Sequence, residues 1–171
     1  MLVSYVKRRI ADYIEQHIAA KMAGEEVRFL RFLSTPVAAK AMAQVLTTTP
    51  TIWGDAERIK LANNVHLVNT LLNVNSGSIE IGENTFFGHN VSLLTGTHPI
   101  EEIGAARQTF PTEGRDIIIG SGVWVSTNAV ILGPCTIGDN AVIAAGAIVL
   151  GGFIPPNTVY GGVPARLIKN I

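Results

Sequence analysis

A six-residue repeat constrains the fold of this 171-residue chain more than any other feature. From residue 61 an apolar side chain recurs at every sixth position, with a frame shift near residue 73 and an interruption before residue 119. So short a period predicts a parallel β-helix, in which each repeat supplies one strand and one turn. The marked positions are Leu61, Leu67, Ile81, Phe87, Leu93, Ile119, Val125, Ile131, Ile137, Ile143, Val149 and Pro155.

Two further columns of the repeat describe its corners. Three residues after each marked position stand residues that tolerate positive φ, which predicts a turn there. They are Asn64, Asn84, Asn90, Gly96, Gly122, Asn128, Asn140, Gly146 and Gly152. Four residues after the mark the side chain is small, as the inside of a tight corner requires; these residues are Ala129, Cys135, Ala141 and Ala147. We therefore interpret Cys135 as structural and not as a nucleophile.

Composition agrees with a β-rich core and excludes several classes of protein. The chain is 47% hydrophobic but only 6% aromatic, so its core consists of aliphatic and small residues that favour strands. A formal net charge of zero argues against a nucleic-acid partner. A single cysteine excludes an internal disulfide framework and a cysteine-rich zinc site. No apolar run is long enough to cross a bilayer, so we expect a cytoplasmic protein.

The N-terminal part has a different pattern, and we divide the chain into an appendage at 1–52 and a β-helix domain at 53–171. Apolar residues recur at helical spacing up to about residue 23, and a second helix-like stretch at 27–46 is interrupted by Pro36. We interpret the appendage as a cap on one end of the solenoid. The alternative is membrane-surface contact through the basic first helix.

Residues 81–166 resemble the hexapeptide-repeat acyltransferases, most closely the maltose and galactoside type of sugar O-acetyltransferase. The resemblance rests on the segments IGENTFFGHNVSLLTGTHP, IGSGVWV, TIGDNAVIAAGAIV and IPPNTVYGGVPARLI. It implies a mainly β fold, a left-handed parallel β-helix with three hexads in each triangular coil. It further implies a homotrimer that uses acetyl-CoA as co-substrate, requires no metal, and binds the acyl-CoA between neighbouring subunits.

His98 is the candidate catalytic residue. It follows Leu93 by five residues, at the corner where a loop predicted over 99–118 leaves the solenoid, and loops of this length are usually functional. The TGTHP segment also matches the catalytic-histidine segment of the family. We predict that His98 is the general base that removes the proton of an acceptor hydroxyl, which attacks the thioester directly without an acyl-enzyme.

Side chains five residues after each mark are predicted to point outward in three columns. The first column is His66, Phe86, Trp124, Val142 and Tyr160; the second is Leu72, Ser92, Val130, Ile148 and Arg166; the third is Ser78, His98, Thr136 and Ile154. The first two columns are rich in apolar residues, which would be a liability on a monomer. Trimer formation, as in the family, would cover them.

The resemblance also assigns binding positions. The implied cofactor-binding residues are Trp124, Thr127, Ala145, Arg166 and Lys169, of which the last two suit the CoA phosphates. The family usually has Thr-Lys-Asp before the double proline, whereas this chain has Leu-Gly-Gly-Phe at 150–153 and so lacks that cation. Asn69 and Ser76 are the implied acceptor-binding residues. In the loop, Arg107, Arg115 and Glu113 either reach a neighbour's pocket or are solvated.

The function expected from these features is acetyl transfer from acetyl-CoA to a hydroxyl of a sugar or polysaccharide precursor. N-acylation of an amino or nucleotide sugar is an alternative, and a non-catalytic β-helix scaffold is another. A γ-type carbonic anhydrase would need three zinc-binding histidines, including a closely spaced pair, which His89 and His98 do not provide.

Overall fold

The computed structural model of the protein describes residues 33–171. The chain divides between Leu46 and Thr47 into two compact units. The helix predicted up to residue 23, and the proposed membrane-surface contact, lie outside the described residues. Helix α3 (Pro36–Thr48) begins at Pro36, where the sequence predicted an interruption. Proline suits the first turn of a helix, and the Thr35 hydroxyl accepts a hydrogen bond from the Ala38 N–H at 3.2 Å.

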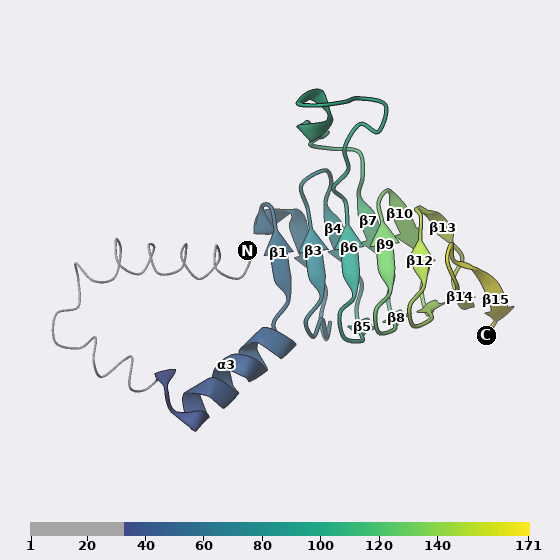
Figure 1. Cartoon of the computed structure of the whole chain (residues 1–171). Coiled ribbons are helices and arrows are strands. Elements are labelled where there is room, and N and C mark those ends of the chain that lie inside the picture. The colour runs from purple at the N-terminus through teal and green to yellow at the C-terminus, as the bar shows by residue number, and fades with distance from the viewer. Residues whose placement is uncertain (1–32) are drawn as a thin grey trace. The chain divides into compact units, whose positions relative to one another are not determined.

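The second unit is a three-sided parallel β-solenoid, consistent with the predicted left-handed β-helix (Figure 1). Sheet A contains β1 (Thr51–Trp53), β3 (Leu71–Asn73), β6 (Ser92–Leu94), β9 (Val130–Leu132) and β12 (Ile148–Val149). Sheet B contains β2 (Ile59–Leu61), β4 (Ile79–Ile81), β7 (Ile117–Ile119), β10 (Cys135–Ile137) and β13 (Gly152–Ile154). Sheet C contains β5 (Phe86–Phe87), β8 (Trp124–Val125), β11 (Val142–Ile143), β14 (Thr158–Gly161) and the antiparallel β15 (Arg166–Asn170). Two short 3-10 helices, η2 (Ala56–Arg58) and η3 (Ala106–Gln108), lie in connections.

The marked apolar residues form the core, as the repeat predicted. Most of them are buried and stacked in register, as in the run from Ile81 through Ile119 to Ile137. The small corner residues Ala129, Cys135, Ala141 and Ala147 are buried beside them. The corner asparagines have φ between 55° and 60° at Asn64, Asn84, Asn90, Asn128 and Asn140, and Gly122, Gly146 and Gly152 also have positive φ. Gly96 is absent from the positive-φ residues, so the turn prediction is wrong there.

Two corners are one residue shorter than predicted, and this overturns part of the column assignment. Between Leu67 and Leu72 the step is five residues, at a turn in which Val68 has φ +50°. Leu72 therefore points inward and is buried, while its neighbour Leu71 takes the outward position opposite Ser92.

The second short corner lies between Val149 and Ile154. Gly151 and Gly152 have φ of +97° and +87°, which lets the chain turn in fewer residues. Ile154, not Pro155, consequently pairs with Ile137 and enters the buried column.

The outward position predicted for Tyr160, beyond this corner, is wrong for the same reason. Tyr160 pairs with Ile143 in the inward column, and Val159 takes the outward place beside Val142. The position predicted for Arg166 is wrong for a different reason: the chain reverses after β14, and Arg166 lies on the antiparallel β15, opposite Gly161 and not above Ile148.

The third outward column also differs from the prediction. In register, the outward residues of sheet B are Lys60, Glu80, Ile118, Thr136 and Phe153. Ser78 and His98 lie outside these strands. The predicted loop over 99–118 ends earlier, because Ile117 and Ile119 are buried in β7. The loop projects from the solenoid between β6 and β7 (Figure 1).

The loop returns to the solenoid through Asp116. Its carboxylate accepts hydrogen bonds from the Ser78 N–H at 2.6 Å and the Ser78 hydroxyl at 2.8 Å. These bonds, the backbone one first, lower the pKa of Asp116 below its ordinary value of 3.8. Because the ionised form is favoured in the folded protein, its contribution to stability is present above the ordinary pKa and is lost as pH falls through the folded pKa.

We therefore predict that Asp116→Asn lowers the urea midpoint at neutral pH and that the difference from wild type disappears in acid. Urea unfolding at a series of pH values from about 7 down to about 2 measures this. Glu101→Gln, at an exposed loop carboxylate, is the control and should leave the pH profile unchanged. A constant difference between Asp116→Asn and wild type at every pH would contradict the assignment.

Candidate active site

His98 lies at the point where the chain leaves sheet A for the loop, and its imidazole is exposed. Its Nδ1 is 2.9 Å from the carbonyl oxygen of Thr109, on the returning part of the same loop. A carbonyl can only accept a hydrogen bond, so in the neutral ring Nδ1 carries the proton and Nε2 carries the lone pair. Phe110 packs edge-to-face against the imidazole with ring centroids 6.1 Å apart.

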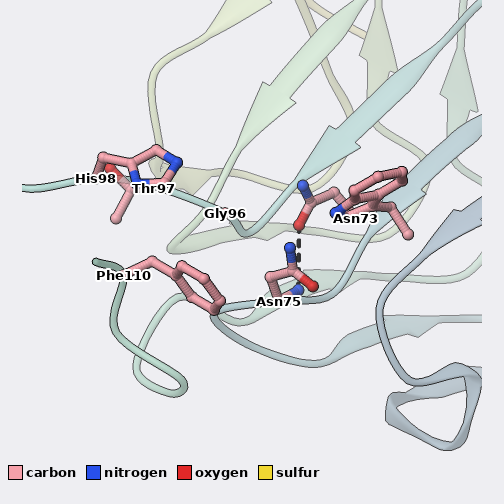
Figure 2. A pocket seen from close by; sticks show the side chains of 7 residues that line it. Asn73, Asn75, Gly96, Thr97, His98 and Phe110 are labelled. Carbon is pink, nitrogen blue, oxygen red and sulfur yellow. Dashed lines mark hydrogen bonds between the residues drawn. The ribbon is translucent and has the colours of Figure 1, made fainter. Parts of the chain in front are cut away.

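A pocket of about 420 Å³ lies beside His98 (Figure 2). Its other lining residues are Trp53, Asn73, Asn75, Gly96, Thr97 and Phe110. Trp53 ends β1 and Asn73 ends β3, and the two residues are paired in register. The pocket thus brings together four segments of the chain: the ends of two strands of sheet A and both ends of the loop.

Two glycines leave room for the amide side chains of this pocket. A Cβ at Gly96 would come within 2.9 Å of the Asn73 amide, and one at Gly54 within 2.8 Å of Asn75 Oδ1. The Asn75 N–H donates to Asn73 Oδ1 at 3.1 Å, the dashed line in Figure 2. Within residues 33–171, Asn73 Nδ2 and the Asn75 side-chain amide have no protein partner, so both can bind a ligand.

His98 also borders a second hollow of about 460 Å³, lined with it by Thr97, Pro99, Thr109, Phe110 and Pro111. The imidazole and the Phe110 ring are common to both hollows. No Asp, Glu, Lys or Arg of the described chain lines either one. The histidine therefore stands between two uncharged spaces, one with free amides and one mostly apolar, in which two substrates could flank one base.

Arginine side chains hold the loop to the solenoid. The Arg58 guanidinium donates to the Val74 carbonyl at 3.0 Å and to the Thr112 carbonyl at 2.7 Å. Arg115 donates from Nε to the Thr95 carbonyl at 2.7 Å. Thr112 is three residues from the carbonyl that holds His98, so Arg58 helps to fix the position of the imidazole. No pattern in the sequence indicated this role for Arg58.

The two acceptor-binding residues implied by the resemblance do not line the pocket. Asn69 donates from Nδ2 to Asn90 Oδ1 at 2.6 Å, at the corner between sheets C and A. Ser76 is fully buried, and its hydroxyl has no partner among the described residues. Asn73 and Asn75 occupy the pocket instead. The only signal in the sequence was that Asn73 interrupts the aliphatic series.

The candidate CoA-binding residues lie on other parts of the solenoid. Trp124, on sheet C, is 43% exposed and stacks on Phe86 with ring centroids 5.9 Å apart. Thr127 and Ala145 lie at the corner between sheets C and A, where the Gly146 N–H donates to the Thr127 carbonyl at 2.9 Å.

Arg166 and Lys169 are exposed on β15. His98 is at the corner between sheets A and B, so the width of sheet A separates it from Thr127 and Ala145 in one chain.

Cys135 is buried, and burial raises the pKa of its thiol to about 11. It is therefore a protonated core residue, as its place in the small-residue column suggested. In residues 33–171 no cluster of three or more His, Cys, Asp or Glu side chains could hold a metal ion. Over the same residues, no helix combines the length and apolar character needed to cross a membrane.

The stacked six-residue coils and the exposed histidine beside a long corner loop define a β-solenoid of the hexapeptide-repeat class. Residues 116–151 match the family model described as bacterial transferase hexapeptide (six repeats). A maltose O-acetyltransferase structure from Clostridium difficile 630 is 32% identical, with a TM-score of 0.50 over 78% of this chain and 74% of that one. The chain belongs to the hexapeptide-repeat acetyltransferase family.

Two further relatives agree with this assignment. Galactoside O-acetyltransferase from Escherichia coli (strain K12) is 35% identical over 122 residues, 71% of this chain and 59% of that protein. A galactoside acetyltransferase structure in complex with coenzyme A is 25% identical, with a TM-score of 0.60 over 92% and 90% of the two chains. The chain spans about half the length of the curated relatives it matches.

We predict that Arg58→Met loosens the loop without unfolding the solenoid. Loss of the hydrogen bonds made by a charged guanidinium should favour local opening and raise trypsin cleavage after the exposed Arg107 by about tenfold or more. Timed digestion followed by mass spectrometry measures the rate. Lys60→Met is the matched control, since Lys60 lies on the adjacent β2 and pairs with Glu80. Equal cleavage of Arg58→Met and wild type would contradict this role.

Proposed function

We propose that this chain transfers an acetyl group from acetyl-CoA to a hydroxyl of a sugar or polysaccharide precursor, with His98 as general base. The observation that carries the proposal is the His98 imidazole, whose Nδ1–H is held by the Thr109 carbonyl and whose Nε2 is left as the base between two pockets. Support comes from relatives named as galactoside and maltose O-acetyltransferases. It also comes from the galactoside acetyltransferase structure in complex with coenzyme A. Because acetyl-CoA is used in the cytoplasm, the proposal includes a cytoplasmic location.

The proposed reaction needs one base and no metal. Nε2 of His98 accepts the proton of the acceptor hydroxyl while the oxygen attacks the thioester carbonyl carbon. A C–O bond forms, and collapse of the tetrahedral intermediate breaks the C–S bond. The imidazolium returns its proton to the departing thiolate, so CoA leaves as the free thiol and His98 is again neutral. The Thr109 carbonyl keeps the ring oriented and stabilises the transient positive charge.

We further propose a homotrimer in which each active site is shared between two copies. His98 and the corner with Thr127 and Ala145 are separated by sheet A, so a site that uses both needs a neighbour. The exposed stack of Phe86 and Trp124 is an apolar surface of the kind that association covers. Arg166 and Lys169, exposed on β15, are suited to the CoA phosphates.

The short corner over 150–153 bears on how CoA is held. It has two glycines and exposed Leu150 and Phe153, and it has no cation. In this proposal the phosphate contacts therefore fall on β15, and the corner offers apolar surface only.

N-acylation of an amino sugar is less well supported. Recognition of an ammonium group favours a nearby carboxylate, and neither hollow beside His98 is lined by one.

We predict that His98→Ala lowers kcat by about 10²–10⁴-fold with little change in the KM for acetyl-CoA. The assay is release of CoA thiol in the presence of sugar acceptors, with the acetylated product identified by mass spectrometry. His89→Ala, at an exposed corner histidine, is the control and should retain activity. Full activity of a folded His98→Ala protein would show that the base is another group.

A further inference from the structure

We propose that the pocket beside His98 selects uncharged acceptors, with Trp53 as the platform on which the apolar face of the sugar ring stacks. This inference rests on the proposed function and specifies its substrate class. Trp53 and Asn75, on which it depends, are residues that neither the repeat nor the resemblance singled out. Three observations carry it: an exposed tryptophan, two unpartnered amides, and the absence of available charge around the pocket in the described chain.

The exposed tryptophan is the first observation. Trp53 is 63% exposed at the end of β1, although tryptophan is usually well buried. It lines the pocket beside Asn73, with which it pairs in register. A flat aromatic ring next to amide groups offers apolar area for the C–H face of a sugar ring and hydrogen bonds for its hydroxyls.

The amides supply the polar part of such a site. Asn73 keeps Nδ2 free, because its Oδ1 accepts the Asn75 N–H, and the Asn75 side chain has no partner in residues 33–171. An amide both donates and accepts, as a hydroxyl does, so these groups match vicinal sugar hydroxyls. The pocket volume of about 420 Å³ is suited to a small ligand such as one sugar ring.

The charge around the pocket is the third observation. Each arginine near the loop directs its side-chain hydrogen bonds to backbone carbonyls, and none of the three lines the pocket. Arg58 donates to Val74 and Thr112, Arg107 to Ile100 and Glu102, and Arg115 to Thr95. In the described lining, His98 is the single ionisable side chain, and the proposed reaction uses it as a neutral base. A carboxylate, phosphate or ammonium on the bound ring would therefore lose water without gaining an ion pair in the pocket.

Acceptor preference tests this directly. With saturating acetyl-CoA, kcat/KM is measured for methyl glucoside and methyl galactoside, and for methyl glucuronide, glucose 1-phosphate and glucosamine. We expect the uncharged rings to be preferred by about 100-fold. Equal or better use of a charged ring would overturn the inference while leaving acetyl transfer itself established.

Substitution of Trp53 provides the residue-level test. Trp53→Ala should raise the KM for the methyl glycoside about tenfold or more and leave the KM for acetyl-CoA unchanged, whereas Trp53→Phe should keep most of the affinity. Ile103→Ala, at an exposed apolar residue of the loop, is the matched control. An unchanged acceptor KM in Trp53→Ala would overturn the role of the platform.

A binding readout separates failure of this inference from failure of the proposed function. Methyl glycosides and methyl glucuronide are titrated into ¹⁵N-labelled protein, and the Trp53 indole N–H signal is assigned by its loss in Trp53→Phe. A shift of this signal by the uncharged glycosides alone, without any turnover, would support the pocket and contradict acetyl transfer to these glycosides. No shift by either ligand would overturn the inference.

Discussion

Backbone hydrogen bonds between successive coils are the constraint on which the rest of the structure depends. In sheet C a row of these bonds joins one coil to the next, each from a backbone N–H to a carbonyl oxygen. The donor and acceptor residues are Phe87 and His66, Gly88 and Val125, Ser126 and Ile143, and Ala144 and Tyr160. Coils stacked about 4.8 Å apart leave one register in which aliphatic side chains meet inside. A slip by one residue would turn every inward side chain to the surface. The strands are therefore fixed, and variation is confined to the corners.

The corner between sheets A and B shows how this confinement builds a site. The loop returns at Arg115, whose backbone passes so close to Gly77 and Gly133 that a Cβ on either would overlap it. Two coils thus fix the point of return, and Arg58 fixes the preceding turn through Thr112. The carbonyl of Thr109 is thereby brought to His98, and Phe110 to the pocket. The rigid solenoid positions the base, and the loop orients it.

The sequence predicted the solenoid because apolar residues at every sixth position show the period and the core, and the column of Asn and Gly residues shows the turns. It did not predict the two five-residue corners. These corners depend on positive φ at Val68 and at Gly151 and Gly152, and the pattern of apolar and polar residues does not reveal backbone conformation. The errors at Leu72 and Tyr160 follow from those corners. His98 was found because it stands at the corner with the long loop. Trp53, Asn73, Asn75 and Phe110 were missed because only the folded register brings these segments together.

The proposal that the His98 of one copy acts with the corner of the next is tested most directly by complementation. His98→Ala and Ala145→Trp chains, each inactive alone, are co-expressed with different tags, and the mixed oligomers are purified through both tags. Each doubly tagged trimer contains one site that combines the intact His98 of one chain with the intact corner of the other, so about a third of wild-type activity should be restored. If each site lay within one chain, mixing could not restore activity, because each variant chain carries a defect in its own site. Mixed oligomers that stay inactive would therefore contradict a shared site.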